Sequence, residues 1–206
     1  MLINKSYFPE YIQFTLNVPD SQVQPYINNV ETQDIVSAIG DQMYAALRLI
    51  YDTNPTMWDN ATAYSAGEFT IIQNGIVKQV YEAIQANTNS NPITNPSDWQ
   101  LSELGSFFEQ YIKPWGVLVC AKEFLTFHGV NVTQFGLRVA DETTSFAVDG
   151  STRAAMLANV NNRANAYYNK MRNRLCDVNW TFDNTVYKID CEIYKIKPNR
   201  FSVNPL

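Results

Sequence analysis

Apolar side chains recur at helical spacing in three stretches of this chain. They cover residues 23–51, residues 101–127 and a final stretch from about Ser151 to about Asp177. Spacings of three and four residues place these side chains on one face, which predicts an amphipathic helix in each stretch. Gly40 interrupts the first stretch and Pro114 the second, and we expect a break or kink at both. The apolar positions expected on the core face of the last helix are Met156, Val160, Ala164, Tyr167, Met171 and Leu175.

Residues 54–99 lack this period and are rich in Asn, Thr and Pro. Two β-prone runs, 69–72 and 76–83, flank Asn74-Gly75, which is the strongest short signal for a β-hairpin. This segment therefore predicts a β-rich module inserted into an otherwise helical chain.

The two ends of the chain show weak alternation of apolar and polar residues. Residues 1–18 predict an extended N-terminal arm, and the last residues are too few to form a core of their own. The expected fold is mainly α, a helical bundle with a small β-rich inserted module and extended N- and C-terminal arms. Its expected parts are the bundle (1–53 and 100–178), the module (54–99) and a C-terminal docking tail (179–206).

Charge is sparse and unevenly distributed. Only 17% of the 206 residues are charged, and a surface poor in charge suits a protein that neighbours cover. Residues 153–206 carry nine basic and four acidic side chains, whereas residues 1–152 carry six basic and sixteen acidic ones. Opposite signs at the two ends suit a head-to-tail ring, although a chance imbalance explains them equally well.

The cysteines and the N-terminus indicate the compartment. Cys120, Cys176 and Cys191 have no CxxC spacing, and we expect Cys120 and Cys176 to be buried free thiols, as in a reducing cytoplasm. The N-terminus has no pattern of a signal peptide, and no apolar run approaches the ~20 residues that span a bilayer. We therefore expect no membrane partner.

Motifs for catalysis are missing from the sequence. The single histidine, His128, precedes a glycine at the end of a predicted helix, where a cation complements the helix dipole. The sequence has no GxSxG, P-loop, GxGxxG or HExxH motif. We expect no enzyme activity, no catalytic residue, no metal and no cofactor.

The last predicted helix carries a group of basic residues with tyrosines between them. Such a helix can follow a phosphate backbone, or it can face solvent or another subunit. The sequence pI of about 4.9 argues against a dedicated DNA-binding protein. The candidates for DNA or subunit contact are Arg163, Lys170, Arg172 and Arg174.

Residues 23–51 resemble the opening of adaptor, or head-completion, proteins of tailed bacteriophages, especially crAss-like and other Bacteroidetes phages. The resemblance rests on Tyr26-Ile27, Glu31, Ile39-Gly40, Tyr44 and Leu47. It implies a non-enzymatic virion protein, assembled in the host cytoplasm, that forms a twelve-fold ring between the portal and the tail. Genomic DNA would pass through this ring without being read in sequence, and further tail or ring proteins would bind it.

The arms are the expected contacts with the portal or with neighbouring subunits. The candidate residues are Lys188, Lys195, Lys197, Arg200 and Phe201 in the tail, and Tyr7, Phe8 and Tyr11 in the N-terminal arm. Periodicity alone fixes neither the copy number nor the surface that faces each partner.

The inserted segment resembles the small carbohydrate-binding modules of chitinases. The matching aromatic positions are Trp58, Tyr64, Tyr81 and Trp99. They predict either a glycan-stacking surface or the core of the module itself, because ~45 residues without disulfides need every ring for packing. The alternative function is therefore a carbohydrate-binding protein whose helical part serves as an oligomerisation stem.

Overall fold

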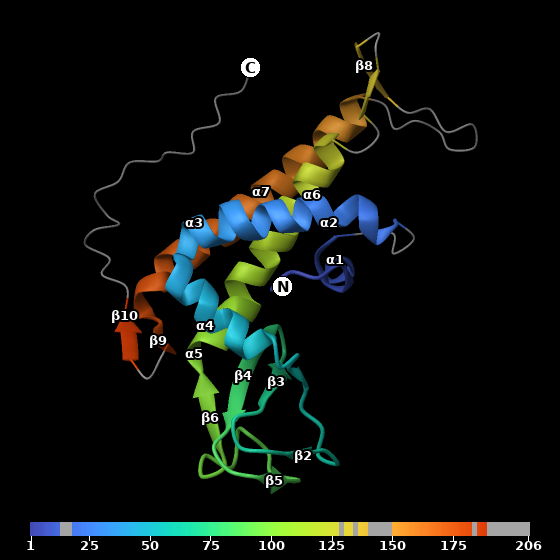
Figure 1. Ribbon diagram of the computed structural model, residues 1–206. Coiled ribbons are helices and arrows are strands. Elements are labelled where there is room, and N and C mark those ends of the chain that lie inside the picture. Colours follow the sequence, from blue (N-terminus) through green and yellow to red (C-terminus); the bar gives the residue numbers. More distant parts are fainter. Residues whose placement is uncertain (13–17, 128–129, 134–135, 140–149, 183–184, 189–206) are drawn as a thin grey trace.

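The structure is a computed structural model, and it describes residues 1–12, 18–127, 130–133, 136–139, 150–182 and 185–188 (Figure 1). The prediction of a mainly α fold with a small β part is confirmed. The helical segments are η1 (Lys5–Tyr7), α1 (Phe8–Tyr11), α2 (Asp20–Asn29), η2 (Val30–Ile35), α3 (Val36–Ile39), α4 (Asp41–Tyr51), α5 (Glu103–Phe107), η3 (Phe108–Ile112), α6 (Lys113–Phe127), α7 (Gly150–Arg174) and η4 (Leu175–Asp177). The strands are β1 (Thr56–Met57), β2 (Ala63–Tyr64), β3 (Phe69–Asn74), β4 (Val77–Ala83), β5 (Asn87–Thr88), β6 (Trp99–Ser102), β7 (Val130–Thr133), β8 (Gly136–Val139), β9 (Asn179–Phe182) and β10 (Thr185–Lys188).

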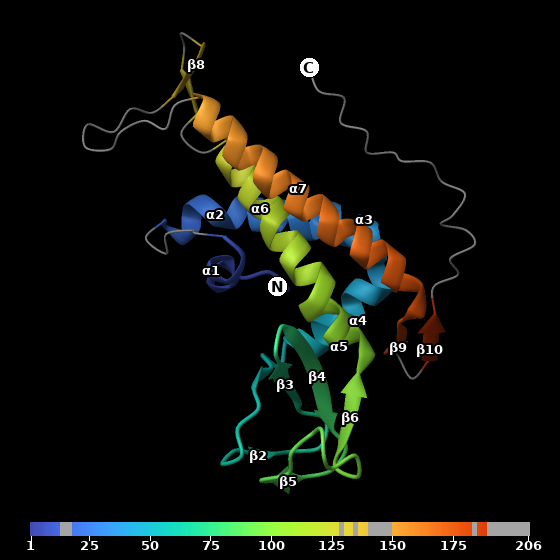
Figure 2. The same cartoon turned by 180° about the vertical axis from the view of Figure 1, so that it is seen from behind.

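Helix α6 lies at the centre of the helical part. Helices α2 and α3 cross one side of it and α7 runs along the other, as the opposite views in Figures 1 and 2 show. The buried residues of α6 are distributed around the helix and include Trp115, Leu118 and Phe124. A helix that is apolar on every side must be enclosed, so α6 organises the layers around it.

The helices break where Gly40 and Pro114 predict. Gly40 has φ 83°, in the left-handed region that favours glycine, and it separates α3 from α4. The backbone widens into the π-helical turn η3 and returns to α-helix at Lys113, one residue before Pro114. In a regular α-helix the proline ring would clash with the carbonyl four residues earlier, and a wider turn relieves that clash.

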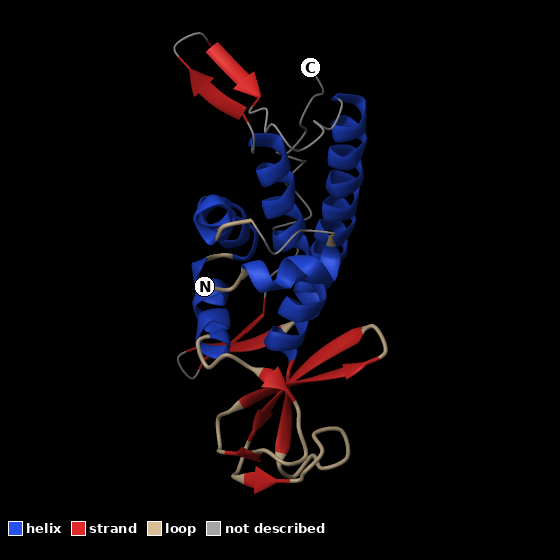
Figure 3. Ribbon diagram, turned by 90° about the vertical axis from the view of Figure 1, so that its right-hand side faces the viewer, coloured by secondary structure: helices blue, strands red, loops and turns tan. Residues whose placement is uncertain are grey.

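The β module lies at one end of the helices (Figure 3). Its main sheet has the order β1-β3-β4-β6, with β3 and β4 forming the predicted hairpin. Asn74 pairs with Val77, so the two-residue turn consists of Gly75 and Ile76, one residue later than Asn74-Gly75 suggested. Gly75 has φ 63°, which the first position of such a turn requires.

The prediction of an extended N-terminal arm is wrong for residues 5–11, which form the short helices η1 and α1. Leu2, Ile3 and Phe8 are fully buried in the main core. Their burial against α6 removes apolar surface from water, which an extended arm in solvent would leave exposed. The N-terminal residues therefore belong to the core of the same chain.

The beginning of the predicted docking tail also packs on its own chain. Strands β9 and β10 form a hairpin, and β9 contacts α4 and α5. Trp180 is buried and stacks on Tyr187, with ring centroids 4.6 Å apart. The rest of the tail, residues 189–206, lies outside the described residues.

Two further expectations need correction. Cys120 is a buried free thiol as predicted, and burial raises its pKa, but Cys176 is disulfide-bonded.

In α7, Val160, Ala164, Met171 and Leu175 are buried as expected. Met156, predicted to be in the core, is 47% exposed and lines a groove together with Ile12 and Leu125.

Gly105 fixes how closely the sheet approaches the helices. A Cβ atom at this position would lie 2.8 Å from Val80 Cβ. We expect Gly105→Ala to lower the free energy of unfolding by about 1–3 kcal/mol, because β4 and α5 would have to separate. Gly116→Ala is the matched control, since its Cβ would meet the flexible ends of Ile3 and Ile35 at 3.0 and 3.1 Å. Equal losses for both variants in urea unfolding would contradict the prediction.

Candidate functional site

A groove of about 800 Å³ lies between the β3–β4 hairpin, the N-terminal segment and the second half of α7. We call it the polar groove. It brings together three residues that the sequence proposed for different contacts, Tyr11 from the arm and Lys170 and Arg174 from the basic helix. Sequence reasoning did not connect Tyr11 with Lys170 and Arg174, because more than 150 positions separate it from them.

A second groove, of about 460 Å³, runs beside the first half of α7. We call it the apolar groove. Its apolar lining residues are Ile12, Leu125, Ala155, Met156 and Val160, and Arg163 lies at its edge. The exposure of Met156, which the helical period placed in the core, is thus explained by this groove.

The turn of the β3–β4 hairpin ends in an apolar tip, which we define as Ile76 and Val77. Ile76 is 99% exposed and Val77 is 40% exposed. The sequence contained a signal for this tip that was missed. Turn positions favour Gly, Asn, Asp, Ser and Pro, so a β-branched apolar residue directly after Asn-Gly is unusual there.

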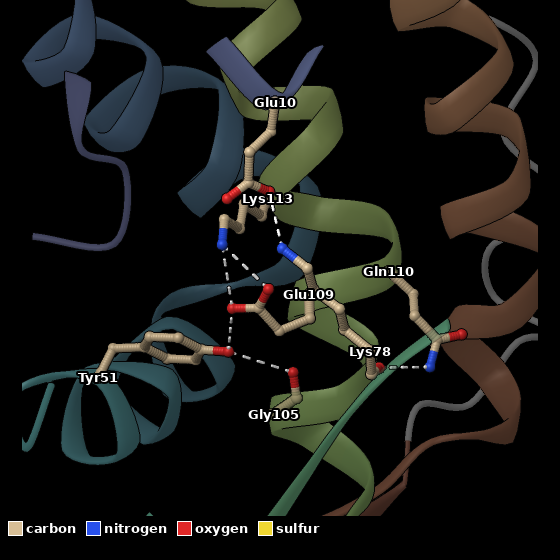
Figure 4. Close-up of polar contacts among 7 residues, drawn as sticks. All are labelled: Glu10, Tyr51, Lys78, Gly105, Glu109, Gln110 and Lys113. Carbon is tan, nitrogen blue, oxygen red and sulfur yellow. Dashed lines mark hydrogen bonds and ion pairs between the residues drawn. The ribbon is translucent and has the colours of Figure 1, made fainter. Parts of the chain in front are cut away.

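A buried polar cluster lies beside the polar groove, and its member Glu109 also lines the groove (Figure 4). Lys113 Nζ lies 3.0 Å from Glu109 Oε2, and both side chains are almost fully buried. The hydroxyl of Tyr51 donates to Glu109 Oε1 at 2.9 Å, and Lys113 Nζ lies 3.9 Å from the centre of the Tyr7 ring. Burial and the nearby Glu109 carboxylate raise the pKa of Tyr51, so the phenol keeps its proton as a donor. These groups satisfy one another, which indicates a structural role.

A second buried carboxylate explains part of the adaptor-like pattern. Glu31 accepts a hydrogen bond from the backbone N–H of Ile3 at 2.7 Å and one from the Tyr44 hydroxyl at 2.9 Å. Glu31 and Tyr44 are two of the residues that carry the resemblance. In this structure they connect α4 and the N-terminus to the π-helical turn η2.

Of the basic residues of α7, Arg163, Lys170 and Arg174 are exposed and line the grooves. Arg153 and Arg172 are half-buried, and Arg153 donates to the Leu125 and Thr126 carbonyls of α6. Arg163 donates to the Tyr11 carbonyl at 2.6 Å, and Arg174 lies 3.5 Å from Asp177. Lys170 and Arg172 lie over tyrosine rings of the same helix. All of α7 is described, and its 25 residues contain five basic side chains and no acidic one.

The predicted partner-binding residues differ in how far the structure buries or exposes them. Phe8 is fully buried, so it offers no surface to a partner, and Tyr7 and Tyr11 are half-buried against the core. Lys188 is exposed in β10. Lys195, Lys197, Arg200, Phe201 and His128 lie outside the described residues.

The aromatic residues of the module gather into a small core. Tyr64 and Trp99 are buried, with ring centroids 5.0 Å apart in an edge-to-face arrangement. Trp99 Nε1 donates to the Ser90 carbonyl at 2.9 Å. Trp58 and Tyr81 pack against this pair and are half-buried. Neither Tyr64 nor Trp99 presents a ring face on which a sugar could stack.

The described part of the chain shows neither a cluster of metal-binding side chains nor a membrane-spanning helix. Within it, no three His, Cys, Asp or Glu side chains gather as they would around a metal ion. None of its helices has the length and apolar character that crossing a bilayer requires.

Comparison with known proteins gives one match. The sequence model of the DUF6712 family, a family of unknown function, matches residues 70–193, which is more than half of the chain. No curated protein and no solved structure matches the chain. The matched residues include the hairpin, η3, α6 and α7.

The buried Glu109–Lys113 pair makes a prediction about stability. Lys113→Met should lower the free energy of unfolding by about 3–5 kcal/mol, because the Glu109 carboxylate stays buried without its cation. The double variant Glu109→Gln/Lys113→Met should be more stable than Lys113→Met alone. Lys78→Met is the control, since its ion pair with Glu10 is partly exposed and contributes only about 0–1 kcal/mol. Equal losses for Lys113→Met and Lys78→Met in chemical denaturation would contradict this prediction.

The packing of the aromatic residues in the module leads to a second prediction. Trp99→Ala should destabilise the module by about 3–5 kcal/mol, because it removes a buried ring and its hydrogen bond. Trp58→Ala should cost less, because Trp58 is half-buried. Urea unfolding followed by tryptophan fluorescence measures both, in parallel with pull-down on chitin. Lost sugar binding without lost stability would instead favour the carbohydrate-binding alternative.

Proposed function

We propose that this chain, which belongs to the DUF6712 family of unknown function, is a structural subunit of the head-to-tail connector of a tailed bacteriophage. In this proposal, copies assemble into a ring that attaches to the portal and links the capsid to the tail. DNA passes through the ring, and the protein performs no catalysis.

One observation carries the proposal, namely the separation of charge across the helical layers. Helix α7 has five basic residues and no acidic one. On the other side of α6, the segment from α2 to α4 has exposed Asp20 and Asp41 and half-buried Asp34 but one basic residue, Arg48, while its fourth carboxylate, Glu31, is buried (Figure 2). A subunit with unlike charges on opposite faces attracts a second copy head to tail, which is the geometry of a ring.

Asp34 is half-buried on this side of the molecule. Burial raises its pKa, the nearby Glu123 carboxylate raises it further, and Lys122 of the same chain lowers it.

The adaptor-like residues support the same proposal through their structural roles. Gly40 turns the chain between α3 and α4, and Tyr44 binds Glu31. These contacts build the helical core that the resemblance implies for a connector subunit. The virion location, the portal as partner and the twelve-fold symmetry come from that resemblance.

Native mass spectrometry of the purified protein tests the proposal, first alone and then with the portal protein of the same phage. We expect a closed ring, either alone or on the portal, and we expect added salt to weaken it because charged faces meet. Lys170→Glu should weaken assembly, because it reverses an exposed charge of α7.

A chain that stays monomeric with the portal at low salt would overturn the connector proposal. If such a monomer bound duplex DNA with an affinity that falls with salt, the basic face of α7 would instead be a DNA contact.

A further inference from the structure

The outer side of α7 carries a row of uncharged residues that no described element covers. Its members recur at spacings of three and four along the helix, and all of them are exposed. We call this row the α7 stripe, and it consists of Ala155, Ala158, Asn162, Ala166, Asn169 and Asn173. The buried residues of α7, which include Val160, Ala164 and Met171, lie on the opposite side, toward α6. The stripe therefore faces away from the core of its own chain.

The composition of the α7 stripe suits contact with a second helix better than contact with water. The solvent side of a surface helix normally carries charged side chains. Alanine leaves the backbone accessible, and the distance between two packed helices depends on the side chains at the contact. The asparagine amides can both donate and accept hydrogen bonds, so they can pair with polar groups of an approaching helix. Spacings of three and four are those of the seam between packed helices.

A second uncharged row lies on the outer side of α2 and α3. Its members are also exposed, and the π-helical turn η2 adds one residue to the spacing between the last two of them. We call this row the α2–α3 stripe, and it consists of Ser21, Pro25, Asn28, Thr32 and Ser37. Each stripe extends over roughly 25 Å of helix. The two stripes therefore match in length and in the small, uncharged character of their residues.

Charges of opposite sign border the two stripes. In α7, an exposed basic residue directly follows each asparagine of the stripe. These residues are Arg163, Lys170 and Arg174. Around the other stripe, residues 20–41 contain four carboxylates and no basic side chain. Asp41 is exposed, and the Asp20 side chain is 82% exposed although Lys5 lies 2.8 Å from it. Contact between the stripes would bring these unlike charges together at its edges.

The two stripes of one chain cannot meet, because α6 separates them. Helices α2 and α3 cross one side of α6 and α7 runs along the other side (Figures 1 and 2). The partner is therefore another molecule, and a second copy fits both stripes at once, since it offers the complementary stripe to each. A nucleic acid would fit only the basic border of α7, because its phosphates would be repelled by the carboxylates around the α2–α3 stripe.

We infer that the α7 stripe of one subunit packs on the α2–α3 stripe of the next subunit. This inference rests on the proposed function and names the helix contact that would join neighbours in the ring. Since the two stripes are different surfaces of one chain, the interface is head-to-tail. Each end of a growing assembly keeps one free stripe until the ring closes.

Cross-linking between single-cysteine variants tests the contact. Ala158→Cys, Asn162→Cys and Ala166→Cys are each mixed with Asn28→Cys under conditions in which the protein assembles, with the portal protein where assembly needs it. A short bismaleimide is then added. We expect a covalent dimer in at least one of the three mixtures and none in any variant alone. The unmodified chain shows whether the native cysteines contribute. Asn60→Cys mixed with Asn28→Cys is the matched control, because Asn60 is an exposed asparagine of the β module.

A second measurement blocks each stripe in turn. Asn162→Trp and Asn28→Trp each place a large ring in the middle of one stripe, at exposed positions where we expect an unchanged unfolding midpoint. Either variant should weaken ring formation at least tenfold in native mass spectrometry, because the two helices can no longer approach closely. Asn60→Trp should assemble like the unmodified chain.

Three outcomes would contradict the inference. Rings that form equally well with Asn162→Trp and Asn28→Trp, or rings in which no mixture cross-links, would overturn it and leave the connector proposal standing. An Asn162→Trp variant that assembles normally but loses binding to duplex DNA would also overturn it and assign the α7 stripe to DNA. A chain that stays monomeric with the portal would overturn both this inference and the connector proposal.

Discussion

The enclosure of α6 is the constraint on which the rest of the structure depends. This helix buries residues on every side, so other segments must cover it all round. Helices α2 and α7 cover two sides, and the N-terminal residues Leu2, Ile3 and Phe8 fill the remaining space. Gly116 permits close approach there, because a Cβ atom at this position would already touch Ile3 and Ile35. Once α6 is covered, α7 has one side packed, and its basic residues Arg163, Lys170 and Arg174 remain exposed.

Helix α4 is fixed in place by two buried carboxylates. Tyr44 and Tyr51 lie seven residues apart on α4, which places both phenols on the same side. One binds Glu31 in η2 and the other binds Glu109 in η3, and both partners occur in π-helical turns. Buried charges add little net stability, because desolvation offsets their attraction. We interpret these contacts as selecting one arrangement of α4 between the two turns.

The sequence predicted the features that depend on local chemistry. Helical periods located the main helices, and Gly40, Pro114 and the Asn-Gly pair located the breaks and the hairpin. It failed where burial depends on distant segments. Weak alternation at Ile12, Phe14, Leu16 and Val18 predicted an extended arm over residues 1–18. Residues 5–11 instead form η1 and α1, because their apolar side chains pack against α6. The period of α7 placed Met156 inside, and no sequence pattern reveals that it lines a groove with Ile12 and Leu125 instead. The grooves were unpredictable for the same reason, since each joins residues far apart in sequence.

Assembly into a closed ring requires a fixed angle between the surface that binds and the surface that is bound. In this chain the hairpin and α7 are both anchored to the segment formed by α5, η3 and α6. The contact of Gly105 with Val80 and the bond from Gln110 to Lys78 hold the hairpin on that segment, and α7 packs along α6. The angle between the hairpin and α7 is therefore set by the core. In the ring that we propose, individually modest contacts would then suffice, because closure multiplies them and a rigid angle directs growth toward closure instead of an open filament.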